Sequence, residues 1–461
     1  MKVSPLILSP TEKPKKQRSA TQIILIGFLA IILCGTLLLS LPCSSRSGQF
    51  TDIRTTLFTS VSATCVTGLV LVDTDTYWSV FGQAVILCMI QIGGLGFMAM
   101  TVLLSLLIKR RITPRERLII TQSLGLNSNE GIIHLMKRIL IGTFSVEFAG
   151  AAVLSTQMIP IFGVGQGIWK GVFHAVSAFC NGGFDLMGGY SGRFSSLAAF
   201  RDNVTVNITV CMLILIGGIG FVVWDDFVNL IAHRRRFSVY SKFVLLLSAV
   251  LIVGGTLVIL LLEYGNPDTI GSLPFGRKLC CSFFQAVTTR TAGFSTIDNV
   301  LFTDGGKAAS MFLMFIGGAS GSTAGGVKIG TFGLLVYTAL TVATGHSEVI
   351  LFKRKIGHEN ILRALSIVII VLTMIIGVAL FITSVDGAPF VDAMYEAMSA
   401  GATVGLSCSL TPSLSLFSHC LLMLLMFFGR VGILTFTYSI LLRITSRTSA
   451  VTYPEANMLV G

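Results

Sequence analysis

The stretch FTSVSATCVTGL, residues Phe58–Leu69, recurs in altered form at three later positions of the chain. The later copies share an aromatic start, a run of small polar residues and a late glycine; they read FHAVSAFCNGGF (Phe173–Phe184), FFQAVTTRTAGF (Phe283–Phe294) and YEAMSAGATVGL (Tyr395–Leu406). Aligned without gaps, the late glycines are Gly68, Gly183, Gly293 and Gly405, at nearly equal spacing. The Val-Thr-Thr run of the third copy is shifted by one residue, which leaves the alignment open there. Four copies in this register indicate an internal repeat over the whole chain.

The composition indicates a membrane protein. Of the 461 residues, 53% are hydrophobic and 12% are charged, whereas about 25% are charged in a typical soluble protein. Several apolar stretches, including Thr21–Leu41 and Ser366–Ile382, approach the roughly 20 residues that a helix needs to cross a bilayer. Helices satisfy their backbone polar groups internally, as lipid requires. We therefore expect an all-α integral membrane protein surrounded by the lipid bilayer.

Other classes of function lack the residues that they need. The net charge of +12 comes from basic clusters between apolar stretches, without the interleaved aromatic residues of a nucleic-acid site. The ten cysteines show no metal-ligand spacing, and the six histidines are scattered. The sequence also lacks the H-E-x-x-H and G-x-S-x-G motifs of hydrolytic enzymes. We expect no catalytic residue, no resident cofactor and no nucleic-acid partner.

Each copy lies between two apolar spans, and the second span of each pair contains glycines. These glycine-rich segments are GGLGF (Gly93–Phe97), GGIGF (Gly217–Phe221), GGASGSTAGG (Gly317–Gly326) and GRVG (Gly429–Gly432). Basic residues cluster before, between and after the repeats: in the N-terminal tail, Lys109–Arg138, Arg234–Lys242, Lys353–Arg363, and Arg443 with Arg447. If each copy crossed the membrane, successive clusters would alternate sides, against the positive-inside rule.

If each copy instead enters the membrane and returns, every basic cluster faces the cytoplasm. This topology has four helix–pore loop–helix repeats, eight membrane-spanning helices around a central pore, and both termini in the cytoplasm. The expected segments are a basic cytoplasmic tail (1–20), repeat 1 (21–119, filter 64–68), repeat 2 (120–238, filter 179–183), repeat 3 (239–352, filter 289–293, intramembrane loop 317–328) and repeat 4 (353–461, filter 401–405).

The four loops have the chemistry of a cation filter. A short helix from each aromatic residue toward the Ser/Thr stretch would direct its negative C-terminal end at the centre. Backbone carbonyls beside each glycine could then replace a hydration shell, and glycine leaves the axis open. The expected ion-binding residues are Thr67, Gly68, Asn181, Gly182, Gly183, Thr291, Ala292, Gly293, Thr403, Val404 and Gly405. Close helix packing would explain one such small-residue segment, but four in register favour a pore.

Charged residues near the filters suggest further roles. Three acidic residues follow the first two filters: Asp73, Asp75 and Asp185. They either concentrate cations at the outer mouth or are ordinary solvated loop residues. Glu147 fits snorkelling or a packing hydrogen bond, and we expect Arg290 to brace the third filter loop.

Two features suggest a gate below the filters. Arg430 interrupts the last apolar span. It is either a barrier to cations or a structural anchor, and the anchor would pair with Glu396 or with a pore-loop carbonyl. The second feature is the glycine-rich break at Gly317–Lys328 in the second span of repeat 3. This break is either a flexible gate or a plain interruption of the helix. The expected gating residues are Gly317, Gly318, Ser320, Gly321, Ser322, Thr323, Gly325, Gly326, Lys328 and Arg430.

Two transport alternatives remain beside a gated filter. A substrate-binding secondary transporter would show two repeats and a site at the membrane midplane, whereas this sequence has four units. A stand-alone cation channel would share the four loops, so the sequence does not separate channel-like flux from ion-coupled flux.

Residues 21–450 resemble the Ktr/Trk/HKT superfamily of potassium transporters, most closely the Ktr-type membrane subunit. The resemblance rests on VTGLVLVDT (Val66–Thr74), TTRTAGFSTI (Thr288–Ile297) and GGASGSTAGGVKIGTF (Gly317–Phe332). It implies potassium at the four filter glycines, a gating loop at 317–328 and a pore arginine at 430. A serine at position 68 accompanies sodium selectivity in some plant relatives, so Gly68 implies potassium. Gly182 replaces an alanine that many relatives have, which leaves fine selectivity at the second filter open.

The same resemblance implies how the chain assembles. It implies a homodimer in the plasma membrane, which in bacteria is the inner membrane, controlled by a cytosolic nucleotide-binding ring of the RCK type. Potassium is the implied transported ion, with sodium as a coupling ion or, in a sodium-selective relative, as the transported one.

Overall fold

The computed structural model describes residues 20–96, 102, 117, 132–234, 236–346 and 348–432. Several predicted features lie outside the described residues: the basic tail up to residue 19, Phe97, most of the loop from Lys109 to residue 131, Arg235, Arg443 and Arg447. Everything below concerns the described residues.

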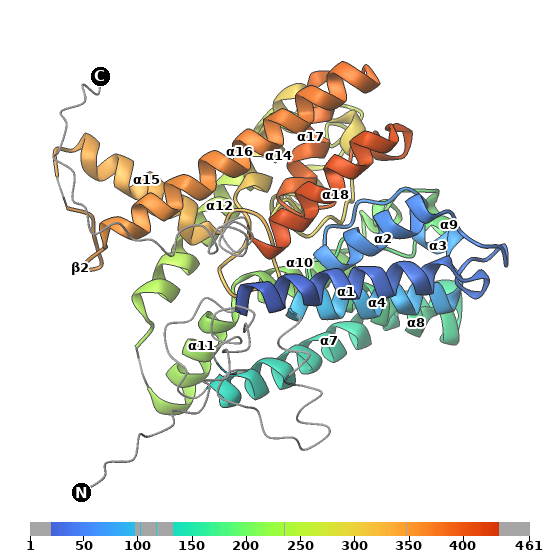
Figure 1. The fold of residues 1–461 in the computed structure, drawn as a ribbon, viewed down its shortest axis with the longest axis horizontal. Helices are drawn as coiled ribbons and strands as arrows, with labels where there is room; N and C mark the ends of the chain where they lie inside the picture. The colour runs from blue at the N-terminus through green and yellow to red at the C-terminus, as the bar shows by residue number, and fades with distance from the viewer. Residues whose placement is uncertain are drawn as a thin grey trace, which may run out of the picture.

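The first two repeats occupy the blue and green parts of Figure 1. Repeat 1 contains α1 (Ala20–Ser40), η1 (Pro42–Ser44), α2 (Ile53–Cys65), α3 (Thr74–Tyr77) and α4 (Val80–Leu95). Repeat 2 contains α7 (Ile132–Phe162), α8 (Val164–Phe179), α9 (Gly188–Ser191), η2 (Ala198–Phe200), α10 (Val204–Gly218) and α11 (Phe221–His233).

The last two repeats follow the same order of elements. Repeat 3 contains α12 (Val239–Glu263), α13 (Phe275–Thr288), η3 (Asn299–Leu301), α14 (Asp304–Phe315), α15 (Ile329–Ala343) and a two-stranded hairpin of β1 (Ile350–Leu351) and β2 (Arg354–Lys355). Repeat 4 contains α16 (His358–Asp386), α17 (Phe390–Gly401), η4 (Thr411–Ser413) and α18 (Leu416–Val431).

Each repeat therefore begins with a long helix, continues with a short helix and a filter loop, and ends with a second apolar helix. The four long helices α1, α7, α12 and α16 are long and apolar enough to cross a membrane. The second helices are shorter or bent, and α10 and α11 meet at 94°. The four short helices before the filters begin upstream of the aromatic residues at which the sequence placed them. This is the predicted all-α membrane architecture.

The second apolar helices break at the glycines that the sequence singled out. Gly96, Gly220 and Gly432 end or interrupt repeats 1, 2 and 4 with φ of 84°, 94° and 88°. A side chain in this region of φ is strained, so glycine suits the break. In repeat 3 the break is widened into the non-helical segment between α14 and α15, residues 316–328.

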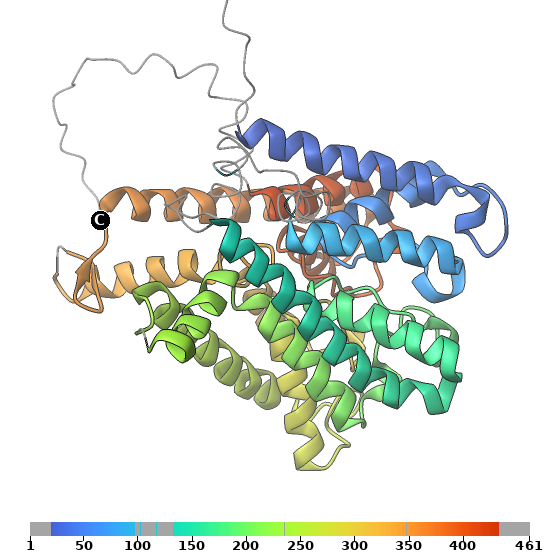
Figure 2. The ribbon, with the colours of Figure 1, turned by 90° about the horizontal axis from the view of Figure 1, so that it is seen from below.

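Contacts between neighbouring repeats close into a ring. The second helix of each repeat packs on the filter helix of the next, in the pairs α4 with α8, α10 with α13, α14 with α17, and α18 with α2. Both views show the red end of repeat 4 beside the blue repeat 1 (Figures 1 and 2). The four filter helices thus surround one axis.

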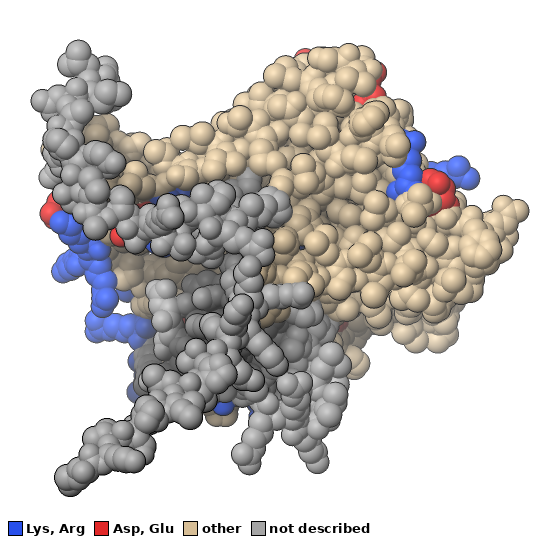
Figure 3. All heavy atoms as spheres, viewed as in Figure 1, with Lys and Arg blue, Asp and Glu red and all other residues tan. Residues whose placement is uncertain are grey.

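The surface has the pattern of a membrane protein. Large apolar side chains such as Leu37, Phe148 and Leu261 are more than two-thirds exposed on the long helices. Uncharged residues cover most of the described surface in Figure 3. Basic side chains gather at one end, near the exposed Lys353, Arg354 and Lys355 of the hairpin. Such an apolar belt suits contact with lipid.

Candidate functional site

The four filter loops share one unusual backbone conformation. The residue two positions before each filter glycine has positive φ in Val66 (57°), Asn181 (58°), Thr291 (72°) and Thr403 (54°). The glycines themselves have φ of 93° in Gly68, 68° in Gly183, 82° in Gly293 and 95° in Gly405. Alternation between left- and right-handed conformations turns successive peptide groups to the same side of the chain. A β-branched residue with positive φ costs about 1–3 kcal/mol, which the surrounding packing must offset.

Hydrogen bonds to the end of each filter helix fix this conformation. In repeats 1, 2 and 4 the amide before the glycine donates to a serine carbonyl five residues earlier; these bonds are Thr67 to Ser62 at 2.8 Å, Gly182 to Ser177 at 2.6 Å and Val404 to Ser399 at 2.8 Å. In repeat 3, Ala292 donates to Thr288 O, four residues earlier, at 2.9 Å. The third loop is one residue tighter, which accounts for the shift in its sequence.

The four glycines approach one another so closely that no side chain fits between them. A Cβ on Gly68 would lie 2.8 Å from Gly182 O, and one on Gly183 would lie 3.1 Å from Ala292 O. A Cβ on Gly293 would clash with Val404 O, and a Cβ on Gly405 would clash with Thr67 O. Each glycine thus faces the carbonyl that precedes the next glycine, and the fourth faces the first. The predicted filter residues form a closed ring around one axis.

The filter helices are placed to favour a cation at this ring. Their last residues, Cys65, Phe179, Thr288 and Gly401, directly precede the four loops, and the first three are buried with no exposed surface. The C-terminal end of a helix carries about half a negative charge. Four such ends around one axis supply negative potential without any acidic side chain in the ring.

The segment 316–328 lies beside the ring and contacts repeats 2 and 4. Within the segment, Gly317 N–H donates to Val327 O at 2.8 Å. Toward repeat 2, Thr323 Oγ1 donates to Phe179 O at the end of α8 at 3.0 Å. Toward repeat 4, a Cβ on Gly326 would lie 2.9 Å from Ala402 O, and one on Gly325 would meet the Thr403 hydroxyl. The expected gating loop therefore packs against the second and fourth filters.

Further hydrogen bonds hold the same loop from outside. Ser320 O accepts from the Tyr240 hydroxyl at 3.2 Å, and Gly321 O accepts from Phe221 N–H at 2.8 Å. Ser322 Oγ donates to Ala319 O at 2.7 Å, and Gly318 O accepts from Ile329 N–H at 3.0 Å. These bonds satisfy the non-helical backbone inside the protein, as membrane depth requires.

Two basic side chains bind consecutive carbonyls of the loop. The Arg430 guanidinium donates to Thr323 O and, at the end of α4, to Gly93 O and to Gly94 O at 2.8 Å. The Lys328 ammonium donates to Ala324 O at 2.7 Å. Arg430 thus joins the loop to repeat 1, and its partners are backbone carbonyls.

One alternative from the sequence paired Arg430 with Glu396, but in the structure Glu396 has other partners. Its carboxylate accepts from the Ser407 and Thr411 hydroxyls at 2.5 and 2.7 Å and from the amides of Cys408 and Leu410 at 3.1 and 3.2 Å. All four donors follow the fourth filter.

A cavity of about 550 Å³ lies on the opposite side of the ring from Arg430. The four filter glycines line its floor, and Asp73, Asp185, Arg193 and Asp298 line its walls. The sequence-based topology would make this cavity the outer mouth.

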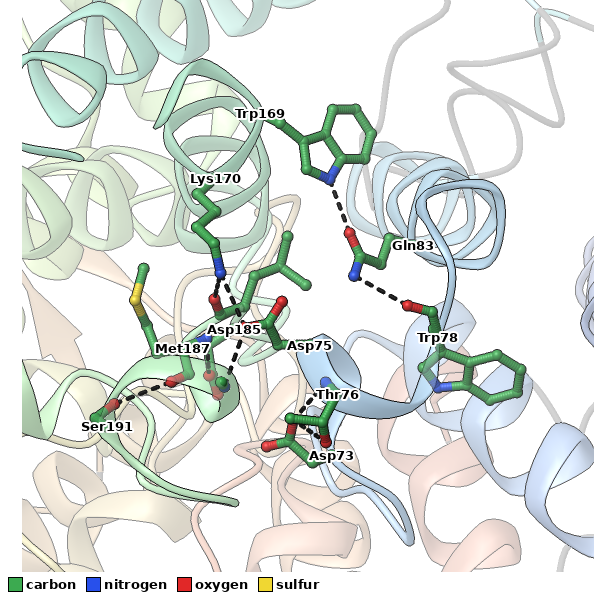
Figure 4. Close-up of polar contacts among 12 residues, drawn as sticks. Asp73, Asp75, Thr76, Trp78, Gln83, Trp169, Lys170, Asp185, Met187 and Ser191 are labelled. Atoms are coloured by element: carbon green, nitrogen blue, oxygen red, sulfur yellow. Dashed lines mark hydrogen bonds and ion pairs between the residues drawn. The ribbon is translucent and has the colours of Figure 1, made fainter. Parts of the chain in front are cut away.

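Asp73 and Asp75 are not ordinary solvated loop residues, which was one of the two alternatives from the sequence. Asp75 accepts from Lys170 Nζ at 2.9 Å and from Arg46 at 3.3 Å, and its residue is 7% exposed. Asp73 accepts from Thr76 N–H at 2.9 Å and from Phe194 N–H at 3.1 Å. Figure 4 shows Lys170 of α8 directed at Asp75, with Asp73 on the neighbouring turn.

Asp185 is less buried than these two and, like Asp73, lines the cavity. Its Oδ1 accepts from Met187 N–H at 3.0 Å. It lies in the loop after the second filter, outside the membrane-spanning helices. Burial raises the pKa of this carboxyl to about 7, and the negative charges of Asp73 and Asp75 act in the same direction.

The whole chain matches a known family. A family model described as TrkH, a cation transport protein, matches residues 3–449. The chain belongs to the TrkH family. It is therefore a multi-pass membrane protein that transports cations and not an enzyme. Within the described part of the chain, no three His, Cys, Asp or Glu side chains are arranged to hold a metal ion.

Individual relatives of the TrkH-family chain cover almost its full length. It is 38% identical to the potassium/sodium uptake protein NtpJ of Enterococcus hirae, covering 98% of this chain and 99% of that one. It is 37% identical to the Ktr system potassium uptake protein B of Bacillus subtilis, covering 95% and 96%. The crystal structure of the potassium transporter TrkH from Vibrio parahaemolyticus has the same fold, with a TM-score of 0.71, 16% identity and coverage of 93% and 86%.

Two buried ionisable residues of this TrkH-family chain have packing roles. Arg290 donates to Ser248 Oγ of α12 at 3.2 Å and so braces the third filter loop, as expected. Glu147 accepts from Gln91 Nε2 at 3.2 Å, which is the packing hydrogen bond among its two alternatives.

Three serines that bind the backbone of the filter loops were not singled out from the sequence. The Ser62 and Ser399 hydroxyls accept from Gly68 and Gly405 N–H at 3.1 and 3.0 Å, and the Ser177 hydroxyl donates to Phe184 O at 2.8 Å. Their signal was a serine six residues before the glycine in three of the four copies.

Proposed function

We propose that this chain takes up potassium through the ring of filter loops, with backbone carbonyls replacing the hydration shell of the ion. The closed four-fold approach of Gly68, Gly183, Gly293 and Gly405 carries the proposal. Carbonyl rings of this kind select potassium in other proteins. The names of two relatives agree, since one is a potassium uptake protein and one a potassium/sodium uptake protein.

The proposal includes a gate beneath the filter. Residues 317–328 close the path while Arg430 and Lys328 bind the carbonyls of Thr323 and Ala324. The two positive charges oppose a cation in the closed state. Opening moves the loop off the second and fourth filters.

The proposal extends to the assembly and its location. The chain forms a homodimer in the plasma membrane, the inner membrane of a bacterium, with both termini in the cytoplasm. A cytosolic nucleotide-binding ring of the RCK type controls it, and uptake is linked to sodium. The Ktr-system name of relatives and the basic end of the surface support these points.

Cation uptake into liposomes tests the filter. The purified chain is reconstituted, and potassium, rubidium and sodium uptake are compared with the Gly68→Ser variant. Position 68 has φ of 93° and lacks room for a side chain, so serine must displace the ring. Gly48→Ser is the matched control, because Gly48 also has positive φ, 68°, but has open space around it. Preference for potassium and rubidium over sodium, reduced in Gly68→Ser alone, supports the filter.

Equal uptake of all three ions, unchanged in Gly68→Ser, would mean that the loops only pack the protein. A sodium-selective relative is the second candidate, favoured by the potassium/sodium name of the 38% identical relative. Faster uptake of sodium than of potassium by the unmodified chain identifies that candidate. A stand-alone channel would conduct potassium at the same rate with and without a sodium gradient.

A further inference from the structure

A second ring of residues lies above the filter glycines. Two positions after each glycine the chain has Val70, Asp185, Ser295 and Ser407. All four line the cavity at the outer mouth. The repeats therefore place one acidic side chain at a position where the other three have uncharged residues.

The two acidic residues that follow the first filter are already engaged. Asp73 accepts from the amide and hydroxyl of Thr76 and from Phe194 N–H. Asp75 binds Lys170 and Arg46. Asp298 Oδ1 accepts from Val300 N–H at 3.0 Å and caps η3, but this exposed residue follows Gly293 by five positions and is not part of the second ring. Lys170, the basic residue nearest these acids, is bound to Asp75 and to Leu186 O. Within the part of the chain that the structure describes, Asp73, Asp75 and Lys170 therefore hold their charges in contacts with protein groups.

Asp185 differs from Asp73 and Asp75 because one of its carboxylate oxygens remains open, and from Asp298 because it belongs to the second ring. Oδ1 accepts from Met187 N–H, and Oδ2 has no hydrogen-bond partner among the described residues. The residue follows Gly183 by two positions, so the carboxylate lies within the cavity wall directly above the ring. Arg193 is the positive side chain that lines the same cavity.

We propose that Asp185 captures the permeant monovalent cation at the outer mouth before the ion enters the ring of glycines. This inference rests on the proposed function, because it assumes that the ring conducts. A single carboxylate in a mouth with protein walls raises the local concentration of cations. Asp185 therefore acts mainly on the concentration of half-maximal uptake and little on the maximal rate.

Rubidium uptake at low ionic strength tests the inference. It is measured at pH 8.5, where the carboxylate is ionised, for the unmodified chain and for Asp185→Asn, Asp185→Glu and Asp268→Asn. The last variant is the control, because Asp268 is an exposed acid in the loop after α12 that does not line the cavity. We expect Asp185→Asn to raise the KM about fivefold, the effect of one charge at about 4 Å in water. Asp185→Glu and Asp268→Asn should stay within about twofold of the unmodified chain.

Ionic strength separates capture by charge from a purely structural role. Screening shortens the reach of a charge from about 10 Å at 0.1 M salt to about 3 Å at 1 M. The KM difference between Asp185→Asn and the unmodified chain should therefore shrink when choline chloride is added. An unchanged KM in Asp185→Asn, or a difference that salt does not reduce, overturns the inference.

A second variant keeps the test decisive if Asp185→Asn is poorly folded. Val70 occupies the equivalent place in repeat 1, so the double variant Asp185→Asn/Val70→Asp moves the charge around the same ring. Recovery of the low KM supports capture, and a well-folded double variant without recovery contradicts it. If the unmodified chain takes up no rubidium, the proposed function fails. If it takes up rubidium selectively without regard to Asp185, only this inference fails.

Discussion

Replacing Arg430 by glutamine should increase cation flux, because it removes the link between the loop and repeat 1. In the structure the guanidinium joins Thr323 O of the loop to Gly93 O and Gly94 O of α4. Glutamine keeps a polar side chain but is too short and uncharged to join both sides. The loop then retains its own hydrogen bonds, including that of Thr323 Oγ1 to Phe179 O.

The size of the effect follows from the bond on the loop side. A hydrogen bond to a charged group contributes about 1.5–3 kcal/mol. Since about 1.4 kcal/mol is a factor of ten, the ratio of open to closed loops should rise about 10-fold to 150-fold. Rubidium uptake should increase by at least about fivefold if the closed loop predominates in the unmodified chain.

Arg363→Gln is the matched control for this change. It removes the same charge from an exposed pair with Glu359 near the start of α16, and it should change uptake by less than about twofold. Both variants are reconstituted at equal protein-to-lipid ratio, and initial rates of rubidium uptake are compared. Equal rates for Arg430→Gln and the unmodified chain would refute the conclusion that Arg430 holds the loop closed.

Two further predictions concern the outer side. Lys170→Met leaves Asp75 buried beside only the half-exposed Arg46, and it should destabilise the fold by about 3–5 kcal/mol; Arg46→Ala should cost less than about 1 kcal/mol. Thermal unfolding in detergent, followed by tryptophan fluorescence, tests this order, and equal melting temperatures of the two variants would contradict it. Glu396→Ala removes the acceptor of four hydrogen bonds behind the fourth filter, so both the melting temperature and the preference for rubidium over sodium should fall. Unchanged preference in folded Glu396→Ala would show that the loop after the filter does not hold the ring.

The four glycines of the loops could be predicted from the sequence because the geometry of the loops favours glycine. Positive φ and a neighbouring carbonyl at Gly68 strongly favour glycine, because any side chain there must displace the next loop, and the same demand recurs at Gly405. Four repetitions make this local requirement visible without any structure. The break glycines Gly220 and Gly432 were recognisable for the same reason.

The tighter third filter loop was harder to predict from the sequence. Thr288 and Thr289 are adjacent and chemically alike, so either could take the place of the serine in the other repeats. Only the helix end decides, because Ala292 N–H reaches Thr288 O. A sequence pattern does not determine where a helix ends to within one residue.

The partners of charged residues depend on how the repeats pack together. Lys170 and Asp75 belong to different repeats, and nothing in either local sequence indicates that they pair. Arg430 binds the carbonyl of Gly94, which any residue could supply, so no side-chain pattern marks it. Such contacts follow from the ring of repeats and become visible only in three dimensions.

The most direct test of the four-fold ring is ion selectivity in the four variants Gly68→Ala, Gly183→Ala, Gly293→Ala and Gly405→Ala. Rubidium uptake into liposomes is measured in competition with potassium and with sodium. Because each glycine faces the carbonyl of the next loop, the account predicts that every one of the four substitutions reduces the preference for potassium. Undiminished preference in all four variants, or its loss in one alone, would contradict a single shared filter.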